Sequence, residues 1–335
     1  MHNRISRWAG LAVGGVLLAL AACAADDTGA PEAPFACLAP PALSRPLTFA
    51  NACPGDPDFP TVVEADGRDV FIRLPKDRVC QRGLSVNGAG NVWIQGGAFL
   101  YTESGKAVIS ISRTSGTSFI EGLGIDVAGK SADAIRVYRN TGRLIVQNTF
   151  ARRISGQPAG IHGDLVHAQG DGPLQELVLQ NVTGYTGYQG LFTPYRPESG
   201  HGARAVRLER VNVAYDPALN RNAGAGKPLM LLFFGSADDL GDRPPDLGTT
   251  LAGVYVDASF WNQPFGRAIY PRPKALFGRC IGFDEAHGIS GRVCEGPPPG
   301  GDFAPEAWVG TGYQRSRFCG PEAAPAAAAG GPVGR

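Results

Sequence analysis

A short strand-like pattern recurs six times between about residues 91 and 261. Each copy alternates apolar and polar residues and closes on an apolar-polar-small step, as in Val92-Trp-Ile94-Gln-Gly. A repeat unit made of strands and turns, with no helical stretch, is too short to bury its own apolar face, so the units must stack. The pattern therefore predicts an all-β solenoid of about six rungs. The copies begin at Val92, Ser118, Leu144, Leu177, Val206 and Val254, which gives successive offsets of 26, 26, 33, 29 and 48 residues.

The composition suits such a fold. The chain has 335 residues, of which 43% are hydrophobic, so it can build a large core. The 47 glycines and 27 prolines supply turns, and a charged fraction of 18% leaves few charged helical faces. The net charge of +1 and the lack of a basic run give no reason to expect a nucleic-acid partner.

The N-terminus has the features of an export signal. Arg4 and Arg7 precede an apolar stretch at 8–22 that is too short and too glycine-rich for a comfortable membrane span. The stretch ends in Leu20-Ala-Ala-Cys23, which resembles the lipobox of bacterial lipoproteins. The resemblance implies a signal peptide at 1–22 and a lipid on Cys23 that anchors the protein to the cell envelope. An ordinary signal peptide with a chance cysteine is the alternative.

The residues after the cysteine bear on the membrane involved. Ala24 and Ala25 follow it, and aspartate comes only at 26 and 27, so the retention signal for the inner membrane is missing. By the same resemblance, this favours the outer membrane and leaves open its periplasmic or surface side.

The remaining cysteines predict disulfides. Six are left after Cys23, an even number in an exported chain, with three before the repeats and three after them. We expect them to staple an N-terminal and a C-terminal cap, with Cys37–Cys53 and Cys280–Cys294 as the local pairs. About fifteen connectivities are open to six cysteines. Zinc is not expected, because there is no CxxC motif or His-Cys cluster.

The chain divides by composition into successive segments. The ends of an open solenoid must be covered, because they expose strand edges and core to water. Two insertions that break the period, at 216–227 and 235–250, are expected to project as loops beside a groove. The predicted segments are a signal peptide at 1–22, a flexible tether at 23–36, an N-terminal cap at 37–82, the repeats at 83–261, a C-terminal cap at 262–320 and a disordered tail at 321–335.

A first strand in each repeat allows spatial neighbours to be predicted. Alternation places Arg136 and Tyr138 on the outward face of one rung, and His167 and Gln169 at the matching positions of the next. Rungs stack about 4.8 Å apart. We therefore expect Arg136 beside His167 and Tyr138 beside Gln169.

In rung length, alternation and the asparagines near turns, Asn148 and Asn181, the chain resembles the right-handed parallel β-helix proteins of the pectate-lyase-like superfamily. The resemblance covers roughly 83–261 and includes no subfamily motif. It implies lysis, hydrolysis or epimerisation of polysaccharides, although some members only bind. The fold alone does not decide among these activities.

The densest polar cluster in the sequence is His162-Gly-Asp164-Leu-Val-His167. For a lyase, Arg136 would neutralise a uronate carboxylate while His167 or Tyr188 removes the C5 proton. For a hydrolase, Asp164 would be one of a carboxylate pair. Its partner would be Asp133, one rung away, or Glu198. The alternative for Asp133 and Asp164 is a structural role at the start of a strand. The predicted catalytic residues are Arg136, His162, Asp164 and His167.

A sugar polymer is the expected partner of this region. Sugar rings stack on aromatic faces while polar side chains reach hydroxyls or carboxylates. A calcium site needs clustered carboxylates, and only Asp133 and Asp164 qualify, so neither metal nor cofactor is expected. The predicted substrate-binding residues are Tyr138, Gln169, Tyr185, Tyr188, Gln189, Tyr195 and Arg196.

Two hypotheses of different class follow. The first is a surface-anchored, monomeric polysaccharide lyase or glycoside hydrolase. The second is a non-catalytic solenoid lipoprotein that binds polysaccharide or has a structural role in the envelope. They differ in whether the predicted catalytic residues and Gln169 converge in one open groove.

Overall fold

Strands stacked in parallel make up most of the described chain. The computed structural model describes residues 36–105, 107–156, 162–169, 174–193, 202–219, 230–234, 248–258, 265–270, 275–277, 279–283 and 288–319. These residues form one sheet of 14 strands and one of 8 strands. The predicted all-β, solenoid-like fold is confirmed at this level. The predicted signal peptide, nearly all of the tether and the C-terminal tail lie outside the described residues.

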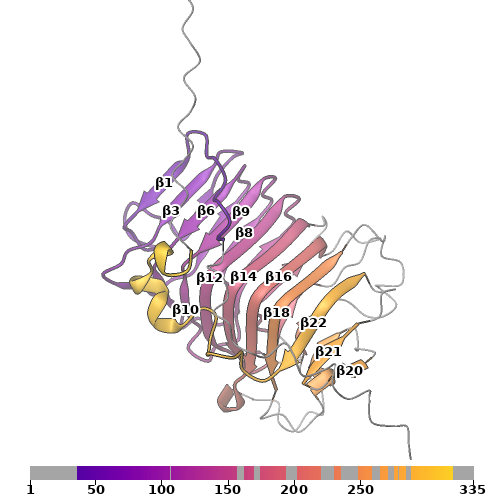
Figure 1. The fold of residues 1–335 in the computed structure, drawn as a ribbon. Helices are drawn as coiled ribbons and strands as arrows, with labels where there is room; N and C mark the ends of the chain where they lie inside the picture. Colours follow the sequence, from indigo (N-terminus) through magenta and orange to yellow (C-terminus); the bar gives the residue numbers. More distant parts are fainter. Residues whose placement is uncertain are drawn as a thin grey trace, which may run out of the picture. The chain divides into compact units, whose positions relative to one another are not determined.

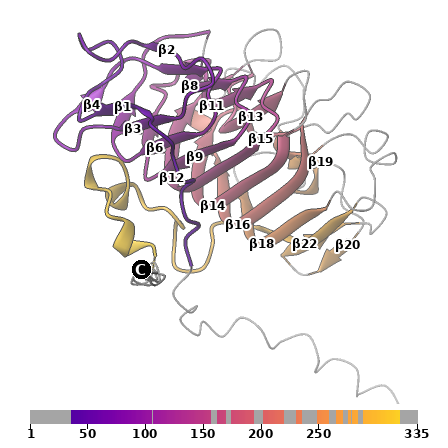
Figure 2. The ribbon, with the colours of Figure 1, turned by 90° about the horizontal axis from the view of Figure 1, so that it is seen from above.

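The smaller sheet is parallel throughout and contains the predicted first strand of each repeat (Figure 2). Its strands in chain order are β2 (Val62–Glu64), β5 (Leu84–Asn87), β8 (Ala107–Ser112), β11 (Asp133–Tyr138), β13 (Val166–Gln169), β15 (Gln189–Phe192), β17 (Met230–Phe233) and β19 (Ile269–Tyr270).

The larger sheet contains the predicted second strands (Figure 1). Its main path is β1 (Leu47–Ala50), β3 (Val70–Arg73), β6 (Val92–Gln95), β9 (Thr117–Glu121), β12 (Arg143–Ile154), β14 (Leu174–Thr186), β16 (Ala203–Tyr215), β18 (Thr249–Asp257) and β22 (Ile289–Glu295). Three short strands, β4 (Val79–Cys80), β7 (Ala98–Leu100) and β10 (Gly124–Asp126), form a parallel ladder that ends on the second half of β12. In this ladder β4 pairs with β7, β7 pairs with β10, and β10 pairs with β12. An antiparallel hairpin of β20 (Ala275–Phe277) and β21 (Cys280–Gly282) adds to β22.

The repeated apolar position forms the centre of the core. Register aligns one aliphatic side chain per strand into a continuous buried column. Each buried aliphatic side chain contributes about 1.5–3 kcal/mol relative to exposure. The column consists of Ile72, Ile94, Ile120, Val146, Leu179, Leu208 and Leu251.

The small residue that closes each repeat turns the chain. Two positions after the aliphatic column, six residues share a positive φ, between 50° and 73°. This left-handed conformation is strained for most L-residues and is easiest for glycine and asparagine. Asparagine adds a contact, since Asn181 Nδ2 donates to Asn148 Oδ1 at 2.9 Å. The six corner residues are Gly96, Gly122, Asn148, Asn181, Arg210 and Gly253.

The parallel ladder extends past both predicted boundaries of the repeats. It starts at β1 and β2, before residue 83, and it reaches β22, after residue 261. The early strands are short and lie in an irregular, proline-bearing segment. Their local pattern is therefore weak, and long-range pairing defines them.

The two terminal segments lie along the outward face of the larger sheet. Outward-facing Phe119, Ile145 and Val178 form a second apolar cluster, against which Leu38 packs. The described helices are 3-10 turns of three or four residues, and none is long and apolar enough to span a membrane. In the last of them, Arg315 forms an ion pair with the fully buried Glu121. Figure 1 shows this C-terminal segment in yellow beside the early strands.

One of the three disulfides joins the two terminal segments to each other. The disulfides join Cys37 to Cys319, Cys53 to Cys80 and Cys280 to Cys294. The predicted pair Cys280–Cys294 is confirmed, whereas Cys37–Cys53 is wrong. The physical reason is that the C-terminal segment comes back to the N-terminal one, so the two ends of the fold are linked to each other.

Candidate functional site

One line of outward-facing side chains crosses the whole of the smaller sheet, and we call it the outward column. Register pairs each member with the next across neighbouring strands. The predicted neighbours Arg136–His167 and Tyr138–Gln169 are confirmed by the register of β11 and β13. The outward column is Val62, Ser85, Ser110, Arg136, His167, Phe192, Phe233 and Tyr270.

Two aspartates lie beneath the middle of this column. The Asp164 carboxylate contacts His167 Nδ1 through Oδ2, and Arg136 Nε donates to Asp133 Oδ2 at 2.6 Å. The two pairs are connected, because the Asp164 amide donates to Asp133 Oδ1 at 2.9 Å. Both aspartates are fully buried, while the Arg136 side chain is 33% exposed. Three of the four predicted catalytic residues thus converge, together with Asp133.

Burial controls the proton chemistry of the cluster. It raises the pKa of Asp164 to about 6; the neighbouring Asp133 adds to this rise, and the hydrogen bond with His167 opposes it. Within the described residues, Asp164 Oδ1 has no hydrogen-bond partner. The contact of Asp164 Oδ2 with Nδ1 fixes the orientation of the His167 ring.

The fourth predicted residue, His162, lies near the same place. Its ring is 5.7 Å from that of Tyr188 and 6.1 Å from that of Phe192, between centroids. Burial lowers the pKa of His162, the charges of His167 and Arg136 lower it further, and Asp133 opposes them. His162 is therefore biased toward the neutral imidazole.

An aromatic row that was not predicted from the sequence continues the outward column. The ring of His167 lies 4.9 Å from that of Phe192, which stacks on Phe233 at 5.1 Å with an interplanar angle of 10°. Phe233 is 5.8 Å from Tyr270. Alternation along the predicted strands at 190–195 and 228–233 could have found the two phenylalanines. Tyr270 falls in the predicted C-terminal cap, where no periodic signal marks it.

The other predicted binding residues are dispersed. Tyr138 is 38% exposed beside Arg139, whose guanidinium lies 4.9 Å from the tyrosine ring centroid. Gln189 is fully buried in β15, and its amide has no hydrogen-bond partner in the part of the chain that the structure describes. The Tyr185 hydroxyl hydrogen-bonds to Asp302, in the C-terminal segment, at 3.0 Å. Tyr195, Arg196 and Glu198 lie outside the described residues, and of Gln169 only the backbone is described.

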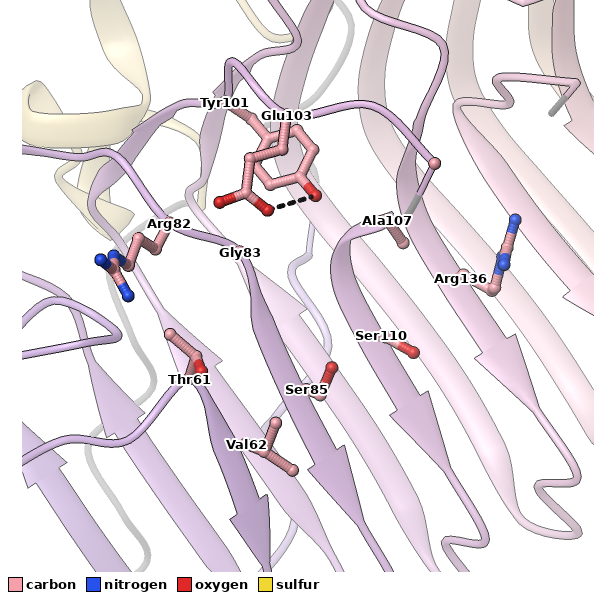
Figure 3. Close-up of a pocket in the computed structure, with 11 residues that line it drawn as sticks. Thr61, Val62, Arg82, Gly83, Ser85, Tyr101, Glu103, Ala107, Ser110 and Arg136 are labelled. Atoms are coloured by element: carbon pink, nitrogen blue, oxygen red, sulfur yellow. Dashed lines mark hydrogen bonds between the residues drawn. The ribbon is translucent and has the colours of Figure 1, made fainter.

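A pocket of about 340 Å³ lies on the N-terminal side of this cluster (Figure 3). We call it the N-terminal pocket. It includes four members of the outward column, from Val62 to Arg136, so it adjoins His167. Around the column it is lined by Thr61, Arg82, Gly83, Tyr101, Glu103, Gly105 and Ala107.

The geometry also permits a test for a metal ion. Ligand atoms of Asp133, Asp164 and His167 lie within 4.8 Å of one another. Both oxygens of Asp133 already accept hydrogen bonds, one of them from the cationic guanidinium of Arg136. The donor set therefore fits a hydrogen-bonded His-Asp pair better than it fits a cation site.

No protein-family model, curated protein or solved structure matches this chain. The functional assignment therefore rests on the geometry alone.

Proposed function

We propose that this protein binds a polysaccharide along the outward column and cleaves it at His167. In this proposal the fold is a right-handed parallel β-helix of about six rungs. Export and a lipid on Cys23 place it in the bacterial envelope, on the outer membrane, as a monomer. Three disulfides support export, because they persist in oxidising compartments.

The observation that carries the proposal is the continuity of the outward column. A polar stretch, a buried His-Asp pair and an aromatic row follow one another at the spacing of stacked strands, about 4.8 Å. A linear chain of sugars is also a repeating polymer, and it presents both polar edges and apolar ring faces. The aromatic row supplies flat surfaces for ring faces, and Arg136 supplies a cationic group for a carboxylate.

Elimination is favoured over hydrolysis. Hydrolysis needs two carboxyl groups facing the glycosidic bond. Asp133 and Asp164 are fully buried and bound to Arg136 and His167. A general base held by a carboxylate, beside an arginine that can neutralise a uronate, fits abstraction of the C5 proton instead.

One observation favours binding without catalysis as the second candidate. His167 is only 7% exposed, and the ring of Phe192 packs against it. A buried His-Asp pair can also serve to hold two neighbouring strands in register. Kinetics separate the two candidates.

The test screens the purified protein against uronate and neutral polysaccharides, with ultraviolet absorbance for unsaturated products and a reducing-end assay. We expect His167→Ala to lower kcat by at least ~100-fold, the scale of a lost general base. Phe233→Ala should raise KM and leave kcat within about twofold, because it removes only stacking area. Circular dichroism confirms that each variant is folded.

A folded His167→Ala variant that cleaves like the wild type would contradict the catalytic assignment. If no glycan is cleaved and Phe233→Ala still weakens glycan binding, the non-catalytic candidate is correct.

A further inference from the structure

The N-terminal pocket has the construction of a binding site in its own right. Its volume of about 340 Å³ lies in the range of small-molecule sites. Ser85 and Ser110 lie on neighbouring strands along its floor, between Val62 and Arg136 (Figure 3). With Thr61 and Tyr101, four hydroxyl-bearing residues line the pocket.

Among the described residues that line the pocket, the charged groups are two arginines and one carboxylate. Arg82 is exposed and has no hydrogen bond or ion pair within the part of the chain that the structure describes. Arg136 uses Nε for Asp133, yet its side chain is 33% exposed and lines the pocket. Guanidinium groups bind carboxylates and sulfates through charge-assisted, bidentate hydrogen bonds, and hydroxyl groups can add further donors.

Contacts in the N-terminal segment constrain the position of Arg82. Its side-chain stem packs so closely on Gly55 that a Cβ at that glycine would come within 2.7 Å of Arg82 Cδ. The disulfide Cys53–Cys80 joins the two segments that carry Gly55 and Arg82. The backbone and the side-chain stem of Arg82 are therefore placed at one end of the pocket by the disulfide and by the contact with Gly55.

We propose that the N-terminal pocket binds an anionic oligosaccharide, with one carboxylate or sulfate ester at Arg82 and another at Arg136, at opposite ends of the pocket (Figure 3). The saccharide nature of the ligand rests on the proposed function, whereas anion binding does not require that His167 be catalytic. A ligand held there enters the outward column at Ser110 and Arg136, next to His167.

Glu103 predicts the direction in which one substitution should change the affinity for an anion. Its carboxylate lines the same pocket and lies 3.5 Å from the hydroxyl of the buried Tyr101. A carboxylate repels an anionic ligand, so its removal should strengthen binding. A neutral sugar would show no such response.

The experiment measures binding by titration calorimetry with the purified full chain. The probes are an oligogalacturonate tetramer, a sulfated carrageenan tetramer and cellotetraose, which separate carboxylate, sulfate and neutral ligands. We expect at least one anionic probe to bind roughly tenfold or more tightly than cellotetraose, with an affinity that falls as salt is raised. Arg82→Gln should weaken that binding roughly tenfold, and Glu103→Gln should tighten it about twofold to fivefold.

Arg68→Gln is the matched control, because Arg68 is an exposed arginine outside the pocket. It should leave the affinity unchanged. Equal binding of the anionic and neutral probes, no binding of any probe, or wild-type affinity in Arg82→Gln would each overturn the proposal. His167→Ala distinguishes anion binding in the pocket from catalysis. If this variant is inactive and still binds the anionic probe, the binding proposal is supported independently of the proposed reaction. Cleavage that is insensitive to Arg82→Gln would refute the pocket alone.

Discussion

At the residue scale, the chemistry of the candidate site depends on the buried pair of Asp164 and His167. A carboxyl group that is fully buried prefers its neutral form unless a partner compensates. The contact with His167 compensates in part, and the pKa of Asp164 remains raised, to about 6. Asp164 is therefore mostly ionised only above about pH 6, in the form that accepts a hydrogen bond from His167 Nδ1.

The raised pKa predicts a pH dependence of stability. The folded protein binds the Asp164 proton more tightly than the unfolded chain, in which an aspartate has a pKa of about 3.9. The contribution of this proton to stability is therefore present below about pH 4 and is lost as the pH rises through about 6. Asparagine does not titrate, so Asp164→Asn does not lose this contribution. We therefore expect the free energy of unfolding of Asp164→Asn, relative to that of the wild type, to increase as the pH rises from about 4 to about 6.

Denaturant unfolding of both proteins at several pH values measures this difference. Other carboxyl groups, such as Asp126, have a lowered pKa and act in the opposite sense in both proteins, so they cancel in the comparison. Parallel stability curves for the two proteins would show that Asp164 does not titrate in this range.

At the scale of the elements, the corner residues determine how strands meet the terminal segments. Gly96 and Gly122 occupy equivalent corners, with φ of 61° and 73°. A Cβ at Gly96 would lie 3.7 Å from the ring of Tyr313, an ordinary contact, but a Cβ at Gly122 would lie 2.2 Å from it. Tyr313 is 4% exposed and hydrogen-bonds to Glu121, so it has little room to move.

Two alanine variants exploit this difference. Gly96→Ala should cost about 1–2 kcal/mol of stability, the strain of a left-handed alanine. Gly122→Ala should cost roughly 1–3 kcal/mol more, because it also displaces Tyr313. Thermal and denaturant unfolding give both values. Equal losses in the two variants would mean that the C-terminal segment does not pack on this corner.

At the scale of the whole molecule, the disulfide Cys37–Cys319 closes a loop of 282 residues, whereas Cys280–Cys294 closes one of 14. In the chain-entropy description, the longer loop stabilises by about 5 kcal/mol and the shorter by about 3 kcal/mol. The terminal disulfide also holds the segments that bury Glu121 and the cluster around Phe119.

We therefore expect the double variant Cys37→Ser/Cys319→Ser to lose more stability than Cys280→Ser/Cys294→Ser. Proteolysis should also cut its terminal segments first, because they cover the sheet without belonging to it. Denaturant midpoints and mass spectrometry of the fragments provide the readout. If the short-loop variant is the less stable one, the terminal segments contribute little to the fold.

Much of the site was predictable because local periodicity carries it. Alternation and the alignment of the first strand of each repeat were enough to pair Arg136 with His167. They could not show that Asp133 holds Arg136, because the two residues are three positions apart and strict alternation would place them on opposite faces of the strand. The aromatic row was not predicted, because two insertions interrupt the repeat. One lies in the sequence between Phe192 and Phe233, and the other lies between Phe233 and Tyr270.

The stacking, the inward aliphatic column and the neighbours across the central rungs are all encoded locally in the amino-acid pattern. They follow from a side-chain period of two and from a unit too short to fold alone. The path of the chain back to its N-terminal segment is a property of the folded molecule. The tertiary structure brings Cys319 to Cys37, covers the outward face of the larger sheet, and places Arg82 opposite Arg136 in one pocket. Such contacts join segments with no shared period, so they depend on how distant surfaces complement each other once the stack has formed.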